Sequence, residues 1–275
     1  MSKVFNMARE SGRKPSDPEE RNHHLRMRGD LLNSLEPRSE SNLEEDYYLS
    51  TLNDEDLEYK KREKAVQNRC SYILQSLEGK SINIAALNVD IVNSSEKVKG
   101  LSHEVAGGYY QAFLENASDL IDYYGGYVLK NVGDCVIAFF PCSKYFTENH
   151  DKAVLCGLAM RDMINNNLNP YFLERKLPSI ECRVSADFGA AKVIRIRSNG
   201  DYSSTDLFGD VMNSAAKISH YAKPSQMVIG DNLFWKLIDS NMFEFKLIHR
   251  WDLIGKKSYP VFLVTGSKKR GESHE

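Results

Sequence analysis

The sequence predicts an α+β fold in which helices cover a largely antiparallel sheet. Short apolar runs of strand length alternate with amphipathic stretches of helix length between residues 80 and 265. Two of these runs are separated by a Gly-Asp turn, which is typical of a hairpin. Hydrophobic residues make up 41% of the 275-residue chain, which is enough to form the core of one large domain.

The segment before this domain differs in composition. Residues 1–52 are polar, with mixed charges and no hydrophobic period, so we expect them to be disordered. Residues 53–79 predict a helix, with acidic residues toward its start and basic residues after them, as the helix dipole favours. Its apolar stripe consists of Val66, Cys70, Ile73, Leu74 and Leu77. This helix either packs on the following domain or joins two protomers in a short parallel coiled coil.

From residue 80 onward, strands and helices interleave. We expect helices at 103–124, 150–167, 209–221 and 231–239, and strands at 82–90, 127–133, 135–140, 181–187, 190–196, 226–230, 243–253 and 258–264. The first of these helices ends at the paired glycines Gly125 and Gly126. The hairpin turns at Gly133 and Asp134, and residues 266–275 form a polar tail.

The charge, hydropathy and cysteine content of the chain argue against several classes of function. The net charge is −2 and no basic face stands out, so we expect no nucleic-acid partner. No apolar run approaches the ~20 residues that span a bilayer, and no N-terminal stretch resembles a signal peptide, so we expect no membrane insertion. Five cysteines, an odd number without a CxxC motif, indicate reduced thiols in a cytoplasmic protein. The seven histidines form no metal-ligand pair at helical spacing, so we expect surface or helix-cap roles for them.

Two aspartates carry the strongest chemical signal. Asp90 ends the apolar run that begins at Ile82, and Asp134 lies in the turn of the expected hairpin. A carboxylate flanked by strand residues is costly to bury without a charge partner. If the two carboxylates converge, they form an oxygen-rich site suited to Mg²⁺ or Mn²⁺. Taken alone, each aspartate is better explained as a turn residue.

The stretch from Asp206 to Lys217 carries a different chemistry. Small residues follow Asn213, so this part of the expected helix can approach a neighbouring surface closely. Asn213 and Lys217 are four residues apart and therefore share one helical face. An amide donor and an ammonium group on that face can contact one phosphate. An ordinary surface helix is the alternative for these residues taken alone.

Three motifs, in this order, resemble those of class III nucleotide cyclase catalytic domains. They are Val89-Asp90-Ile91-Val92, Lys130-Asn-Val-Gly-Asp134 and the stretch from Asp206 to Lys217. The resemblance covers residues 80–265. It implies a ferredoxin-like domain, here with an N-terminal helical extension, and a lyase that forms a cyclic nucleotide and pyrophosphate.

The resemblance implies a two-metal site and a phosphate-binding turn. Asp90, the main chain of Ile91 and Asp134 would hold two Mg²⁺ or Mn²⁺ ions from one protomer. The N–H groups of the turn after Asp90 would receive the triphosphate. This turn consists of Ile91, Val92, Asn93, Ser94 and Ser95. Asn93 tolerates a positive φ, and Ser94 and Ser95 can cap the helix that follows.

The resemblance further implies a site that recognises the nucleotide base and a set of catalytic residues. Lys130 and Asp206 resemble the pair that recognises adenine, with Lys130 donating to N1 and Asp206 accepting from the exocyclic amine. Asn213 would orient the ribose, and Lys217 would face the charge that develops on the α-phosphate. The family usually has Arg at the position of Lys217, so we expect a slow enzyme. Lys256 resembles a phosphate-contacting lysine, and a solvated hairpin explains it as well.

These assignments predict an adenylate cyclase that works as a head-to-tail homodimer. The metal-binding aspartates would come from one chain, and the base and catalytic residues from its partner. Two alternatives stay open. One is a pyrimidine nucleotide cyclase of the phage-defence type, producing cyclic CMP or cyclic UMP. Lys130 and Asp206 argue against it, but the turn at 93–95 differs from the Gly-Phe-Thr of most relatives and keeps it open. The other is a non-catalytic homology module that binds a nucleotide or dimerises.

Overall fold

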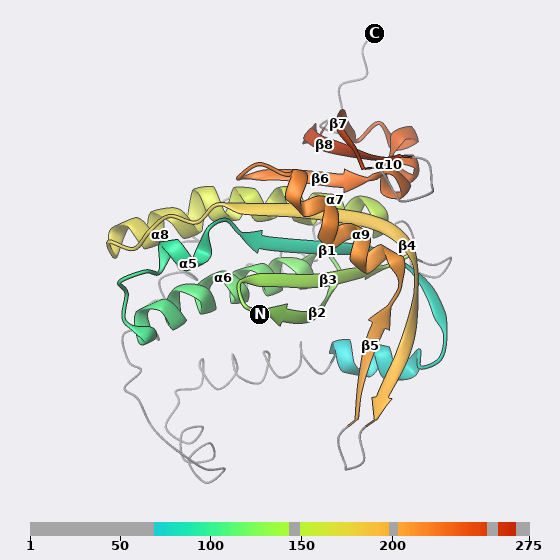
Figure 1. Ribbon diagram of the computed structural model, residues 1–275, viewed down its shortest axis with the longest axis horizontal. Helices are drawn as coiled ribbons and strands as arrows, with labels where there is room; N and C mark the ends of the chain where they lie inside the picture. The colour runs from blue at the N-terminus through green and yellow to red at the C-terminus, as the bar shows by residue number, and fades with distance from the viewer. Residues whose placement is uncertain (1–68, 143–148, 198–202, 252–257, 268–275) are drawn as a thin grey trace, which may run out of the picture.

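The computed structural model describes residues 69–142, 149–197, 203–251 and 258–267 (Figure 1). The predicted polar segment 1–52, the start of the predicted helix 53–79, Lys256 and the tail beyond 267 lie outside these ranges. Within the described ranges, no helix combines the length and the apolar character needed to cross a membrane.

Eight strands form one sheet in the order β2-β3-β1-β4-β6-β8-β7, and β5 pairs with β4 beside this path (Figure 1). The strands are β1 (Ser81–Ile91), β2 (Tyr127–Val132), β3 (Cys135–Pro141), β4 (Cys182–Arg197), β5 (Ser203–Phe208), β6 (Gln226–Gly230), β7 (Phe243–Trp251) and β8 (Tyr259–Ser267). Among the described strands, β4 and β6 are parallel and the other pairs are antiparallel. The predicted, largely antiparallel sheet is therefore confirmed.

The helices follow the predicted order. They are α5 (Ser94–Lys97), α6 (His103–Tyr123), α7 (Asn149–Met163), α8 (Asn169–Glu174), α9 (Asp210–Ile218) and α10 (Asp231–Leu237), and the predicted N-terminal helix is described over residues 69–76. A π-helix, Ile164–Leu168, joins α7 to α8, so this helical stretch is longer than the predicted 150–167. It continues past residue 167 into α8, which accommodates Pro170 in its first turn.

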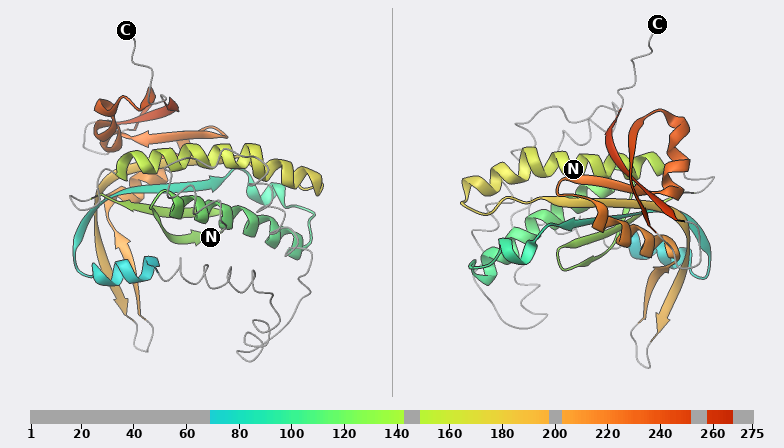
Figure 2. Two further views of the ribbon diagram at one scale, coloured as in Figure 1. Left: turned by 180° about the vertical axis from the view of Figure 1, so that it is seen from behind. Right: turned by 45° about the horizontal axis from the view of Figure 1, so that its top comes forward.

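Alternate residues of β1 face two different cores. Ala85, Leu87 and Val89 are fully buried in the larger core, beneath α6, α7 and α10. Ile84 and Ala86 face a second core, which includes residues of α9 and of the helix at 69–76. The view from behind in Figure 2 shows α6 and α7 across one side of the sheet, and Figure 1 shows α9 on the other. Helices therefore cover both faces, as sandwiched apolar strands require.

The structure differs from the prediction in the region of β4 and β5. Residues 182–197 form one strand rather than the predicted pair 181–187 and 190–196, because Gly189 stays in register with Ile84 of β1. A side chain at position 189 would meet Val211 of α9 at 3.0 Å, so this glycine allows close helix packing and makes no turn. Strand β5 was not predicted, because its sequence is mostly polar and shows no apolar run.

Candidate active site

The two sequence-predicted metal aspartates lie at the same end of the sheet. Asp90 of β1 is paired with Cys135 of β3 and with Arg183 of β4. Asp134 lies in the hairpin turn immediately before Cys135, close enough for its charge to act on Asp90. Burial raises the pKa of Asp90, and the charge of Asp134 raises it further, while Arg183 and His220 act in the opposite direction. The two carboxylates thus repel each other across a partly buried site.

This pair of carboxylates fits a hard divalent cation. Its ligand atoms are oxygens, and a bound cation would cancel the repulsion that raises the pKa of Asp90. Over the described part of the chain, no group of three or more His, Cys, Asp or Glu residues forms a complete metal site. A cation held by Asp90 and Asp134 would therefore take its other ligands from main-chain oxygens, water and substrate phosphates, as Mg²⁺ often does.

The structure brings two further basic residues near Asp90 that no sequence motif indicated. Arg183 is its cross-strand neighbour on β4, and its Nε atom is buried and has no hydrogen-bond partner among the described residues. His220 lies in the short 3-10 helix Ser219–Tyr221 that follows α9, and it is exposed, as expected. Neither residue belongs to a local motif. Only the register between β1 and β4 would have pointed to Arg183.

Lys130 and Asp206, which are 76 residues apart in sequence, form an ion pair. Lys130 Nζ donates to Asp206 Oδ2 at 2.6 Å. The other carboxylate oxygen, Oδ1, accepts the N–H of Leu207 at 2.8 Å, which fixes the orientation of the carboxylate. Both side chains remain partly exposed, so a ligand can reach the pair.

An irregularity in β2 directs Lys130 toward this position. The register with β3 shifts between Val128 and Lys130, so Leu129 is a bulge. Lys130 is opposite Ile137 and therefore projects on the face of the second core. Bulges frequently re-aim a side chain beside an active site.

The turn after Asp90 has the expected backbone but not the expected caps. Asn93 has φ 53°, in the left-handed region that Asn tolerates. Asn93 itself is the N-cap of α5, without a side-chain capping bond, and Ser94 and Ser95 are the first helical residues. The prediction that these serines cap the helix is therefore wrong. The N–H of Val92 donates to the carbonyl of Glu181 at 2.8 Å and is not available to a phosphate.

Helix α9 presents Asn213 and Lys217 at its exposed surface. Its other side is fixed to the sheet, because Val211 and Ala215 are buried and Ser185 Oγ donates to the Ala215 carbonyl at 2.8 Å. The sequence-predicted sharing of one helical face by Asn213 and Lys217 follows from this helix. Lys256 lies in the undescribed stretch 252–257, so its predicted role is untested.

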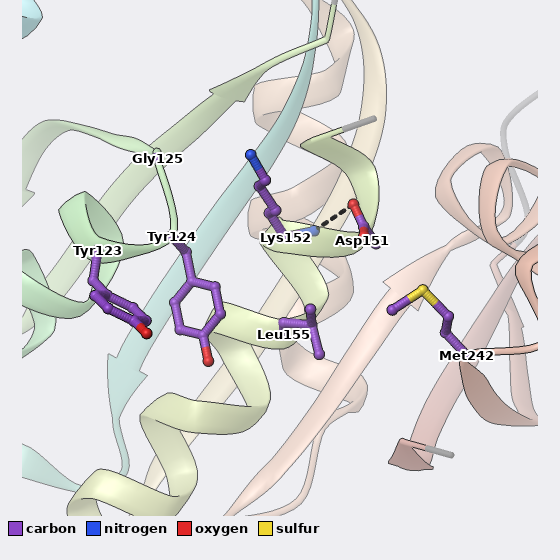
Figure 3. Close-up of a pocket in the computed structure, with 7 residues that line it drawn as sticks. All are labelled: Tyr123, Tyr124, Gly125, Asp151, Lys152, Leu155 and Met242. Atoms are coloured by element: carbon purple, nitrogen blue, oxygen red, sulfur yellow. Dashed lines mark hydrogen bonds between the residues drawn. The ribbon is translucent and has the colours of Figure 1, made fainter. Parts of the chain in front are cut away.

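A shallow pocket lies on the opposite side of the sheet (Figure 3). It is lined by Tyr123, Tyr124, Gly125, Asp151, Lys152, Leu155 and Met242. Its one carboxylate, Asp151, accepts the N–H of Lys152 at 2.9 Å. This pocket lacks the paired carboxylates, so the Asp90 side is the candidate active site.

The family model described as "Adenylate and Guanylate cyclase catalytic domain" matches residues 80–266, which is more than half of the chain. The chain therefore belongs to this family of nucleotide cyclases, and the predicted family and α+β fold are confirmed.

The curated relatives that the chain resembles include a cytidylate cyclase and uridylate cyclases. The chain is 24% identical over 168 residues to a cytidylate cyclase of Escherichia coli, a match that covers 56% of this chain and 35% of that protein. It is 27% identical over 194 residues to a uridylate cyclase of Burkholderia cepacia, covering 68% of this chain and 82% of that protein. The expected preference for ATP is not confirmed by these relatives.

Solved structures share the fold at low sequence identity. The adenylyl cyclase CyaB from P. aeruginosa superposes with a TM-score of 0.63 at 19% identity, covering 69% of this chain and 97% of that one. The guanylate cyclase domain of RhGC from Catenaria anguillulae, solved with GTP, gives 0.60 at 17% identity, covering 69% and 100%. Since these proteins differ in base, the shared fold does not assign one.

Proposed function

We propose that this protein is a pyrimidine nucleotide cyclase that converts CTP to 3′,5′-cyclic CMP and pyrophosphate. The observation that carries the proposal is the Lys130–Asp206 ion pair, a donor beside an acceptor within reach of a ligand. The names of the curated relatives, a cytidylate cyclase and uridylate cyclases, support a pyrimidine base.

The ion pair favours cytosine among the pyrimidines. Cytosine presents an unprotonated ring nitrogen, N3, next to an exocyclic amine, so Lys130 can donate to N3 and Asp206 can accept from the amine. Uracil presents a ring N–H and a carbonyl at the same places, which reverses both hydrogen bonds. A reversed pattern leaves two polar groups unpaired and is strongly rejected.

Asp90 and Asp134 would hold divalent cations, which when bound neutralise the triphosphate and acidify the ribose 3′-hydroxyl. The 3′-oxygen attacks the α-phosphorus, the bond to the bridging oxygen of the β-phosphate breaks, pyrophosphate leaves, and the hydroxyl proton passes to solvent. Arg183 lies beside Asp90, and the positive charge of its guanidinium is suited to a triphosphate oxygen. The N–H groups of Ser94 and Ser95 have no acceptor within their own helix, so they too can bind phosphate.

The remaining chemistry is assigned to α9 of a second protomer. Asn213 orients the ribose, and Lys217 stabilises charge on the α-phosphate as it develops in the transition state. A head-to-tail homodimer would place these residues and the Lys130–Asp206 pair of one chain opposite the aspartates of the other. Such a site is incomplete in a monomer.

Incubation of the purified chain with each of the four nucleoside triphosphates and Mn²⁺, followed by identification of the cyclic product, tests the proposal. Cyclic CMP as the dominant product is expected. Dominant cyclic UMP or cyclic GMP would refute the role of the ion pair, and no product from any substrate would favour a non-catalytic module.

Adenylate cyclase is the second candidate, and one observation favours it. Adenine presents N1 and an exocyclic amine in the same order as cytosine, so the same ion pair can recognise ATP. The two bases differ in size, because the purine edge lies farther from the ribose. Competition of CTP and ATP for one enzyme, measured as the ratio of their kcat/KM values, separates the candidates.

A further inference from the structure

The second core contains the described end of the N-terminal helix, residues 69–76, drawn in cyan in Figures 1 and 2. Cys70 is 7% exposed and Leu74 is 2% exposed, so both side chains are enclosed. Their neighbours come from five strands and from α9. The buried members are Ile84, Ala86, Phe139, Ala191, Val193, Leu207, Val211 and Ala215, with Tyr127 and Leu129 packed at the margin.

Arg69 attaches the same helix to the start of β2. Its guanidinium pairs with the carboxylate of Asp122 in α6 and lies over the ring of Tyr127, 5.5 Å from the ring centroid. Tyr127 is the first residue of β2, the strand that carries Lys130. The helix therefore contacts this strand through Arg69 and shares the second core with it.

Strands β2 and β5 need such a support, because no backbone pairing joins them. In the sheet, β2 pairs with β3 and β5 pairs with β4. Lys130 and Asp206 nevertheless meet at 2.6 Å. Leu129 precedes Lys130 and Leu207 follows Asp206, and both leucines pack in the second core. The side chains of the helix thus share one apolar core with the immediate neighbours of both members of the ion pair.

We propose that Leu74 is a positioning residue, which sets the separation of β2 and β5 and thereby the geometry of the Lys130–Asp206 pair. The inference rests on the proposed function, in which this pair recognises the base. It adds that the docking of the N-terminal helix controls base selectivity. A displaced helix would alter base recognition and leave the Asp90 carboxylate in place, since Asp90 is fixed by β3 and β4.

Leu74→Ala and Leu237→Ala form a matched pair of variants. Each removes the same atoms from a leucine that is 2% exposed, but Leu237 lies in α10 and packs in the larger core. Both should lose thermal stability to a similar degree. Leu74→Ala should also raise KM about tenfold and change the CTP to ATP product ratio, because it misplaces the pair. Leu237→Ala should leave KM and product ratio at the wild-type values.

Hydrogen–deuterium exchange gives a readout that does not depend on turnover. Leu74→Ala should speed exchange in β2 and β5 but not in β6, and Leu237→Ala should leave β2 and β5 unchanged. If Leu74→Ala does not fold, Ile73→Ala at the margin of the core gives a milder change. Tyr72→Ala, at a 77% exposed position of the same helix, should behave as wild type.

The inference is overturned if the core variants of the helix and Leu237→Ala give equal KM values and product ratios, with no local gain in exchange. A wild-type protein that forms no cyclic nucleotide would instead refute the proposed function. The exchange measurement then decides the positioning role by itself.

Discussion

At the residue scale, the fold disfavours the charged form of Asp90. Burial and the neighbouring Asp134 both raise its pKa, so the ionised form is less stable in the protein than in water. Such a group adds nothing to stability at neutral pH in the absence of a cation. Its presence is explained if the site exists to bind one.

Replacing Asp90 with Asn should therefore separate stability from activity. Without metal at pH 8, Asp90→Asn should melt at or above the wild-type temperature, because the repulsion by Asp134 is relieved. Product formation with Mn²⁺ should fall about 10²-fold or more. Thermal melting and product chromatography measure the two effects, and Asp239→Asn, at an exposed position, is the control. A large loss of melting temperature would show that the carboxylate is structural.

A substitution at Lys217 should raise activity, whereas the substitution at Asp90 should lower it. A lysine is a point charge, whereas an arginine offers a planar pair of donors to a phosphate. Lys217→Arg should therefore raise kcat several-fold, up to about tenfold, with little change in melting temperature. Lys223→Arg, just beyond α9, makes the same exchange away from the proposed site and should leave kcat unchanged. An unchanged or lower kcat in Lys217→Arg would contradict the assigned role.

At the element scale, the junction of β5 and α9 places Asp206 and Asn213 on adjoining elements. Gly209 connects them and lies against the bend of β4, where an added Cβ would meet the Ala190 carbonyl oxygen at 2.5 Å and the Ala191 Cα at 3.0 Å. Its backbone is extended, so the requirement for glycine here is close approach and not an unusual φ.

Gly209→Ala should consequently cost about 1–3 kcal/mol of unfolding free energy through overpacking. It should also raise KM, because the junction between β5 and α9, which carry site residues, must move away from β4. Gly107→Ala is the matched control, since nothing lies within 4 Å of its added Cβ on the exposed side of α6. That change should stabilise the protein by about 0.5–1 kcal/mol. Urea unfolding and steady-state kinetics measure both variants, and equal effects would argue against a special packing role for Gly209.

The elements with strong hydrophobic periodicity could be predicted from the sequence. The hairpin of β2 and β3 and helix α6 lie where the apolar pattern and the glycines place them. Strand β5 could not be predicted in this way, because its polar sequence gains strand structure only by pairing with β4. The sequence predicts two strands in place of the long β4, because Gly189 has the appearance of a turn residue. Its actual role is close contact with α9, which only the tertiary structure reveals.

The residues of the candidate site also fall into two groups, those that sequence motifs indicate and those that only the structure reveals. Asp90, Asp134, Lys130 and Asp206 stand in recognisable motifs, so the sequence alone could nominate them. Arg183 could not be nominated, because its nearness to Asp90 depends on strand register. The bulge at Leu129 likewise has no sequence signature, although it decides which face Lys130 occupies.

At the scale of the whole molecule, Asp187 is a fully buried carboxyl group that connects three elements. It lies in β4, where Tyr259 of β8 donates its hydroxyl to Oδ2 at 2.7 Å and the N–H of Phe188 donates to Oδ1 at 2.8 Å. The N–H of Leu233 in α10 is a further donor. Burial nevertheless raises the pKa of Asp187 from 3.8 to about 6, assisted by the nearby charge of Asp231.

This shift predicts a pH dependence of stability. Because the folded-state pKa lies above the unfolded one, the folded protein holds an extra proton between about pH 4 and pH 6. The resulting stabilisation, about 3 kcal/mol at most, is present below pH 4 and is lost as the pH rises through 6. Tyr259→Phe removes the hydroxyl donor and should raise the pKa of Asp187 further, so it should destabilise more at pH 8 than at pH 5. Urea unfolding at both pH values measures this, with Tyr72→Phe as an exposed control. A penalty independent of pH would show that Tyr259 does not interact with the charged carboxylate.

At the scale of the dimer, mixed variants can test whether each active site contains residues from one chain or from two. Asp90→Asn and Asp206→Ala should each abolish product as purified homodimers. If the site is shared head to tail, a mixed dimer has one site with both mutations and one site with neither. Equal amounts that exchange freely give half mixed dimers, so the mixture should recover about a quarter of wild-type activity. Two copies of the same variant mixed together provide the control and should remain inactive. If all site residues act within one chain, every site in the mixture carries a mutation, and no activity returns.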